Sequence, residues 1–68
     1  MNVFIIRHYD ADNLITILSA DNSDRAAEYY REISDVHPSN FYVTWIPEVH
    51  ADREFVIYST WLDEENDD

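Results

Sequence analysis

The chain has 68 residues, of which 46% are hydrophobic and 15% aromatic, and it contains neither cysteine nor glycine. Fifteen Asp and Glu residues stand against four Arg and no Lys, which gives a formal net charge of −11. The length predicts one small domain, and the apolar content is too high for a disordered acidic segment. The missing residue types exclude disulfides, thiolate metal sites and phosphate-binding glycine loops, and the lack of clustered cations argues against direct binding of nucleic acid.

The first two predicted elements are strands joined by a short turn. Residues 3–7 and 14–19 are rich in β-branched and aromatic side chains, which favour strands. Residues 9–13 between them contain Asp and Asn, which are typical of turns because they bond their own backbone and tolerate the left-handed region. We expect the two strands to pair as a hairpin.

A helix is predicted after the second strand. Asp21, Asn22 and Ser23 are all residue types that cap helix N-termini. The dipeptide His37-Pro38 should end the helix, because the residue before a proline avoids the helical region. Apolar residues three or four positions apart predict one buried stripe, formed by Ala26, Tyr29, Tyr30, Ile33 and Val36.

Two further strands complete a ββαββ order. Residues 41–46 form the third strand, which Pro47 should close because proline cannot donate to a strand ladder. Residues 54–62 form the fourth, and residues 47–53 are long enough for a loose hairpin between the two. The expected fold class is α+β, with a four-stranded antiparallel sheet and one helix in a single domain over residues 1–62. Residues 63–68 form an acidic C-terminal tail.

The predicted strands are apolar on both of their alternating faces, as in the run Val3-Phe4-Ile5-Ile6. One helix covers only one face of such a sheet, so the other face would be a larger apolar patch than a monomer usually tolerates. We therefore expect a homodimer or a protein partner on that face. The alternative is that the loops and the acidic tail fold over it.

The pair Arg7-His8 at the end of the first strand looks like the start of the histidine phosphatase family, in which a strand delivers an Arg-His-Gly turn. Tyr9 stands where that family has the glycine, and the chain has only four arginines to bind phosphate. It is also far shorter than that fold, and its net negative charge would repel a phosphate. We therefore interpret Arg7-His8 as the end of a strand.

No other pattern indicates catalysis or a bound cofactor. His8, Asp10 and Asp12 form an H-x-D-x-D pattern that could hold a hard cation through its oxygens. However, Leu14 stands where the next ligand should be, and no glycine or distal Glu follows. We expect no catalytic residue, no metal site and no cofactor.

The acidic residues form groups that are candidate partner-binding sites. The first group lies on the predicted helix at spacings of four, four and three, and comprises Asp24, Glu28, Glu32 and Asp35. A four-residue step rises about 6 Å, close to the spacing of phosphates along a nucleic-acid strand. Glu28 could pair with Arg31 one turn away and soften this stripe. The other candidate sites are the tail acids Asp63, Glu64, Glu65, Asp67 and Asp68, and the turn acids and aromatic anchors Tyr9, Asp10, Asp12, Tyr42 and Trp61.

Two resemblances bear on function. The hairpin followed by a helix that begins with Ser23, Ala26 and Tyr29 resembles a recurrent ββαβ type of small phage-encoded protein. The composition resembles the acidic nucleic-acid mimics that phages use against host defence, including anti-CRISPR and anti-restriction proteins. This resemblance implies an inhibitor whose carboxylates stand in for phosphates and occlude the basic DNA- or RNA-binding surface of a host defence protein.

Two functions follow from the sequence. The first is the acidic nucleic-acid mimic, and the alternative is a small dimeric interaction or regulatory module that binds a protein partner through its open sheet face. Salt distinguishes them, because a mimic should lose its basic partner steeply as ionic strength rises. No apolar run approaches the roughly 18 residues of a membrane span. We therefore expect a cytoplasmic protein, which would act in the host-cell cytoplasm if it is phage-encoded.

Overall fold

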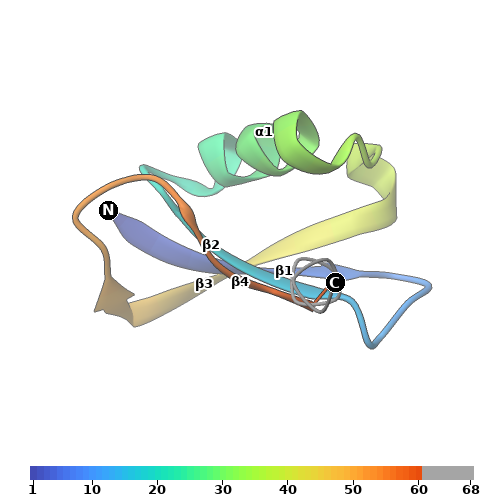
Figure 1. Ribbon diagram of the computed structural model, residues 1–68, viewed down its shortest axis with the longest axis horizontal. Helices are drawn as coiled ribbons and strands as arrows, with labels where there is room; N and C mark the ends of the chain where they lie inside the picture. Colours follow the sequence, from blue (N-terminus) through green and yellow to red (C-terminus); the bar gives the residue numbers. More distant parts are fainter. Residues whose placement is uncertain (61–68) are drawn as a thin grey trace, which may run out of the picture.

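In the computed structural model, which describes residues 1–60, one helix lies across one face of a four-stranded antiparallel sheet (Figure 1). This confirms the predicted α+β class. The elements, in chain order, are β1 (Asn2–His8), β2 (Ile15–Ala20), α1 (Ser23–Ser34), the 3-10 turn η1 (Pro38–Asn40), β3 (Phe41–His50) and β4 (Val56–Ser59). Within residues 1–60, no helix is both long and apolar enough to cross a membrane.

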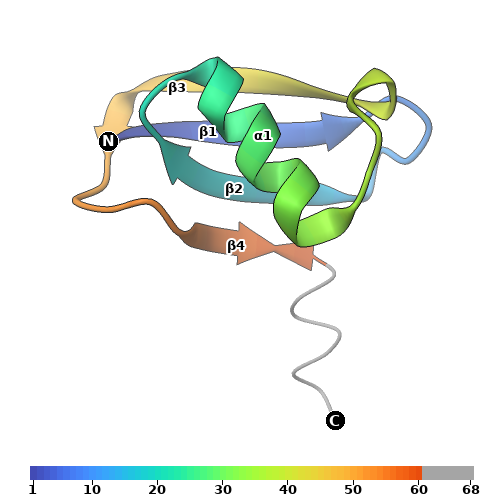
Figure 2. The same cartoon turned by 90° about the horizontal axis from the view of Figure 1, so that it is seen from above.

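The order of the strands in the sheet is β3-β1-β2-β4 (Figure 2). The predicted hairpin of β1 and β2 is confirmed, with Arg7 facing Ile15 at the turn end. The predicted hairpin of the third and fourth strands is wrong, because β3 pairs with β1 while β4 pairs with β2 at the opposite edge. The Ser19 hydroxyl contributes to this placement, because it accepts the backbone N–H of Phe55 and donates to the carbonyl of Arg53.

The third strand does not end at Pro47, as predicted, but continues to His50. It is an edge strand that pairs only with β1 among the described residues, so the missing N–H of a proline is tolerated there. The pairing is irregular beside it, since Val3 faces Ile46 while Asn2 faces His50.

The helix begins and ends with identifiable caps. The side chain of Asn22 accepts the backbone N–H of Arg25 at 2.8 Å, which satisfies one of the free donors of the first turn. The helix ends at Ser34, before the predicted stop at His37-Pro38, because Asp35 adopts a left-handed conformation with φ of 61°. The N–H of Asp35 then donates to the carbonyl of Arg31 and closes the last turn.

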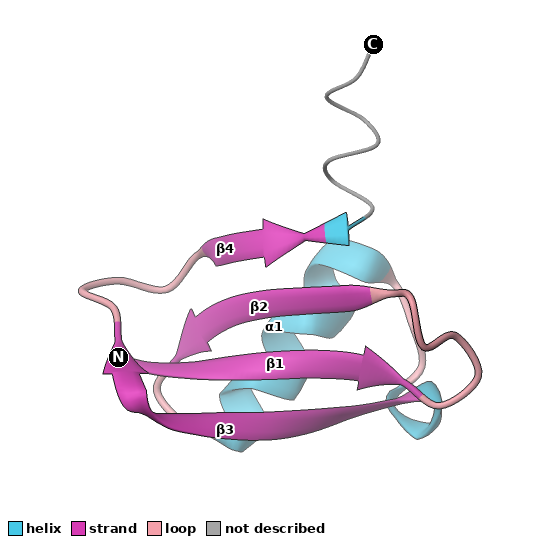
Figure 3. Ribbon diagram, turned by 90° about the horizontal axis from the view of Figure 1, so that it is seen from below, coloured by secondary structure: helices cyan, strands magenta, loops and turns pink. Residues whose placement is uncertain are grey.

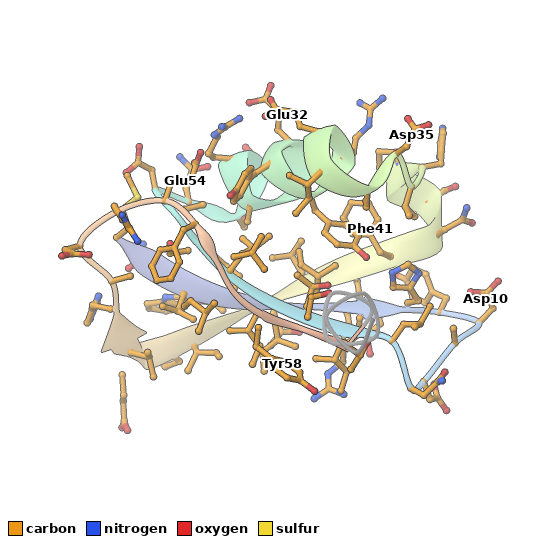
Figure 4. The ribbon with its side chains drawn as sticks, in the orientation of Figure 1. Asp10, Glu32, Asp35, Phe41, Glu54 and Tyr58 are labelled. Carbon is orange, nitrogen blue, oxygen red and sulfur yellow. The ribbon has the colours of Figure 1, made fainter. Side chains whose placement is uncertain are left out.

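The predicted apolar stripe of α1 packs on the sheet. Ala26 and Tyr30 are buried, and the rest of the stripe is partly buried against the same cluster. From the sheet, Phe41 projects between the two layers (Figure 4). The sheet side of this core comprises Phe4, Ile6, Leu18, Ala20 and Phe41.

Candidate partner-binding surfaces

The face of the sheet that is turned away from α1, called the open face below, is defined by the strand register (Figure 3). Residues that lie opposite each other on paired strands share a face. Tyr58 projects from this face in Figure 4, on the side away from the helix. The open face has three rows across the strands, which are Tyr42–Arg7–Ile15, Thr44–Ile5–Ile17–Tyr58 and Ile46–Val3–Ser19.

The open face is apolar and largely uncovered. Its isoleucines are only half-buried, and Tyr42 and Tyr58 are 39% and 43% exposed. Arg7 is the one charged side chain in the three rows. Val3 and Ser19 in the last row are buried, and Ser19 bonds to the segment before β4. Within residues 1–60, two rows of the open face are therefore uncovered. The alternative that the acidic tail folds over them concerns residues 63–68, which lie outside the described residues.

The predicted acidic stripe lies on the exposed side of α1. All four of its carboxylates are on exposed residues, and Glu32 and Asp35 point away from the sheet (Figure 4). Asp35 is the C-cap of α1 rather than a helical residue. The stripe and the open face are thus on opposite sides of the molecule.

A cluster around Arg25 neutralises part of the stripe. One guanidinium nitrogen, Nη1, lies 2.7 Å from Glu28 and 3.2 Å from Glu32. The other two nitrogens donate to the two carboxylate oxygens of Glu54, from Nη2 at 2.7 Å and from Nε at 2.8 Å. Because Glu54 precedes β4, the cluster ties the first turns of α1 to the edge of the sheet.

The Arg25 cluster also corrects the predicted Glu28–Arg31 pair. Within residues 1–60, every ion pair involves Arg25, which reaches Glu28 from the preceding turn. Hydrogen bonds from its guanidinium hold the pKa of Glu54 below its usual value, and Glu54 in turn raises the pKa of Arg25. Two of the four stripe acids therefore have a cation beside them, whereas Asp24 and Asp35 form no ion pair within residues 1–60.

The predicted turn acids and aromatic anchors lie at one end of the molecule. Asp10 and Asp12 are exposed in the loop between β1 and β2. The ring of Tyr9, which is 66% exposed, packs on the ring of Tyr42 with 4.9 Å between centroids. Tyr9 therefore extends the first row of the open face. Trp61 and the predicted tail sites Asp63, Glu64, Glu65, Asp67 and Asp68 lie outside the described residues.

Arg7 and His8 point to opposite faces of the sheet. Arg7 belongs to the open face, whereas the Nε2 atom of His8 is hydrogen-bonded to the hydroxyl of Tyr30 at 2.7 Å, on the helix side. The two side chains therefore do not form one site. Among residues 1–60, no three His, Asp or Glu side chains are close enough together to hold a metal ion.

Sequence reasoning missed two features of these surfaces. The first is the contact of Arg25 with Glu54, which spans 29 residues, although local pairing of Arg25 with acids of its own helix was visible in the sequence. The second is Trp45, which is 55% exposed and lies on the helix side opposite Phe4, beside the start of α1. Only the position of β3 beside β1 places Trp45 there.

Comparisons with known proteins give no relative. No protein-family model matches the chain, and no curated protein or solved structure is significantly similar to it. Its function must therefore be inferred from the geometry and chemistry of its own residues.

Proposed function

We propose that this chain is a small interaction module that forms a homodimer through the open face of its sheet and presents its acidic helices outward. The observation that carries the proposal is the open face itself. Two of its rows expose isoleucine and tyrosine side chains, and nothing within residues 1–60 lies over them. Apolar patches of this kind commonly mark protein interaction sites.

Charge favours a second copy of the chain as the occupant. Two molecules that each carry a net charge of −11 repel each other, so they associate most easily through their least acidic surfaces. The open face has no acidic residue in its three rows, and the acidic stripe lies on the opposite side of each molecule. Contact between two open faces, stacked about 10 Å apart, keeps the stripes at the greatest distance.

The test is the molar mass in solution. Ile17 is one of the two inner positions of the middle row, and Tyr58 is its exposed neighbour on β4. We expect a dimer by light scattering or sedimentation at physiological ionic strength, and a monomer for both Ile17→Glu and Tyr58→Glu. Trp45→Glu places the same charge on the helix side of the sheet, at a position that is 55% exposed, and it should remain a dimer.

Circular dichroism should show that the variants are folded, and Tyr58→Glu is the safer of the two because its side chain is already exposed. A monomeric parent protein, or a dimer that both substitutions leave intact, would contradict the proposal.

A second candidate function is the acidic nucleic-acid mimic. It is favoured by the exposed acids without an ion pair in residues 1–60, among them Asp24 and Asp35, and by an overall charge of −11. Such a protein would act as an anti-CRISPR or anti-restriction inhibitor that binds a basic nucleic-acid-binding host protein. The pairing of Glu28 and Glu32 with Arg25 weakens the stripe and makes this the second candidate.

The mimic predicts that binding weakens steeply as salt is added, whereas a dimer through the open face should be strengthened by salt, which screens the repulsion between two chains of charge −11. Affinity for a purified basic nucleic-acid enzyme should fall by several orders of magnitude between low and moderate salt. Duplex DNA should compete the protein off. Substituting Asp24 and Asp35 with Asn should weaken such binding more than any change on the open face.

A further inference from the structure

A hollow on the described surface lies at the carboxyl end of α1, on the helix side of the sheet. It has a volume of about 240 Å³ and is lined by His8, Leu14, Tyr30, Ile33, Ser34 and Val36. These residues come from the end of β1, the residue before β2, and the last turn of α1 with the residues that follow it. The hollow is therefore separate from the open face and from the Arg25 cluster.

The floor of this hollow is held rigidly. Tyr30 is 1% exposed, and its hydroxyl is hydrogen-bonded to Nε2 of His8 at 2.7 Å. Its ring is also packed edge-on against Phe41, with 4.9 Å between centroids. The Ser34 hydroxyl donates to the carbonyl of Tyr30. A site whose side chains are fixed before binding loses less entropy when a ligand enters.

The walls are apolar and the size fits one ring. Leu14, Ile33 and Val36 are each only half-buried, so their side chains face the hollow without being covered by residues 1–60. A cavity of about 150 Å³ is enough to hold benzene. The hollow therefore has room for one six-membered ring and a short alkyl link, and it is too small for a nucleotide.

The rim favours a positive charge. The last turn of α1 ends here, and the carbonyl ends of a helix carry a partial negative charge. Asp35 lies in the sequence between Ser34 and Val36, which line the hollow, and it is exposed. Asp10 is at the same end of the molecule (Figure 4). Arg31 is the one basic residue of that last turn. Acidic groups and the helix end thus outweigh a single cation.

We propose that this hollow is a binding site for a small aromatic amine, with the ring between Leu14, Ile33 and Val36 and the ammonium group at the carboxyl end of α1, on the side of Asp35. The ring can lie against the edges of His8 and Tyr30, as aromatic pairs prefer.

The test uses the full chain and three probes of similar shape: 2-phenylethylamine, 3-phenylpropan-1-ol and 3-phenylpropionate. Binding is followed by the backbone amide signals of residues 33–36 in a two-dimensional NMR titration. We expect affinity in the order amine, alcohol, carboxylate, with about tenfold between the first and the last, because one charge near an exposed carboxylate contributes a few-fold in each direction.

Matched variants localise the site. Val36→Trp should fill the hollow and abolish binding of the amine, whereas Val49→Trp, an exposed position on β3, should not. Asp35→Asn keeps a residue type that tolerates the left-handed conformation, and it should weaken the amine about threefold without affecting the alcohol. Asp24→Asn at the other end of α1 should leave both unchanged, and Arg31→Gln should strengthen the amine.

Equal binding of the amine and the carboxylate, absence of binding by all three probes, or full binding by Val36→Trp would overturn the proposal. None of these results bears on the dimer, since the hollow and the open face share no residue.

Discussion

The two faces of the sheet are made of alternate residues of the same strands, but they meet different surroundings. On β2, Leu18 points toward α1 and is fully buried, while Ile17 beside it lies in the open face and is only half-buried. The helix side carries the acidic stripe on its outer surface, and the open face carries one cation, Arg7. One helix is therefore enough to build a core for four strands, and the chain does not need to bury the second apolar face in order to fold.

The largest expected effect separates these two neighbours. Leu18→Ala should lower the free energy of unfolding by about 3 kcal/mol, because it opens a cavity in a closed core. Ile17→Ala should lower it by about 1 kcal/mol, because a half-buried side chain loses less contact. Urea denaturation at low protein concentration, where the chain is a monomer, measures both.

If Leu18→Ala is too unstable to be folded in buffer, both variants can be compared in a stabilising osmolyte, which strengthens burial. Equal losses at the two positions would show that something covers the open face even in the monomer.

Much of this arrangement followed from local sequence patterns, and the rest depended on contacts between distant residues. The alternation of apolar residues predicted both faces of the sheet, and the stripe that contains Tyr30 predicted the helix side of the core. The order of the strands was not predictable in this way, because β3 could pair with either neighbour and still bury the same residues. The early end of the helix depends on the left-handed backbone of Asp35, which Asp tolerates but does not require.

The same distinction between local patterns and distant contacts applies to the candidate surfaces. The open face was expected because the strands carry apolar residues on both sides of the sheet, and one helix covers only one side. A softening of the acidic stripe was expected, but with Arg31 rather than Arg25 as the partner of Glu28. The contact of Arg25 with Glu54 was not expected, because it spans 29 residues of chain. Charge spacing along a helix is visible in a sequence, whereas a partner from another element is not.

The next largest effect tests how much the N-terminal cap of α1 contributes to the stability of the protein. Asn22→Ala removes the side chain that accepts the N–H of Arg25, and should cost about 1 kcal/mol of unfolding free energy. Asn22→Asp should retain most of the stability, because Asp caps helices equally well. Thermal unfolding followed at 222 nm, the usual helix signal, checks the order of the three proteins. An unchanged Asn22→Ala protein would mean that packing alone fixes the start of α1.

A smaller effect concerns the one charge on the open face. In a dimer through this face, Arg7 loses part of its hydration, which opposes association. Arg7→Leu should therefore tighten the dimer about threefold, equivalent to less than about 1 kcal/mol. Arg31→Leu makes the same change on the exposed side of α1 and should leave the dimer unchanged. Weaker association of Arg7→Leu would instead indicate that Arg7 binds a carboxylate of the second copy.

The smallest expected effect is the pH dependence of the anchor between α1 and the sheet. The hydrogen bonds from Arg25 lower the pKa of Glu54 in the folded chain below its usual value of 4.5. A carboxyl group with a lowered folded pKa stabilises the protein above its unfolded pKa, and this contribution is lost as the pH falls through the folded value. Protonation of the other acids acts in the opposite direction at first, because it relieves the repulsion of a chain with a charge of −11.

The contribution of Glu54 is therefore the difference between the parent and Glu54→Gln, measured as urea midpoints from pH 7 to below 4.5. The parent should be the more stable at neutral pH, and the two should converge below that pKa. A gap that stays constant with pH would assign the role of Glu54 to packing rather than to its charge.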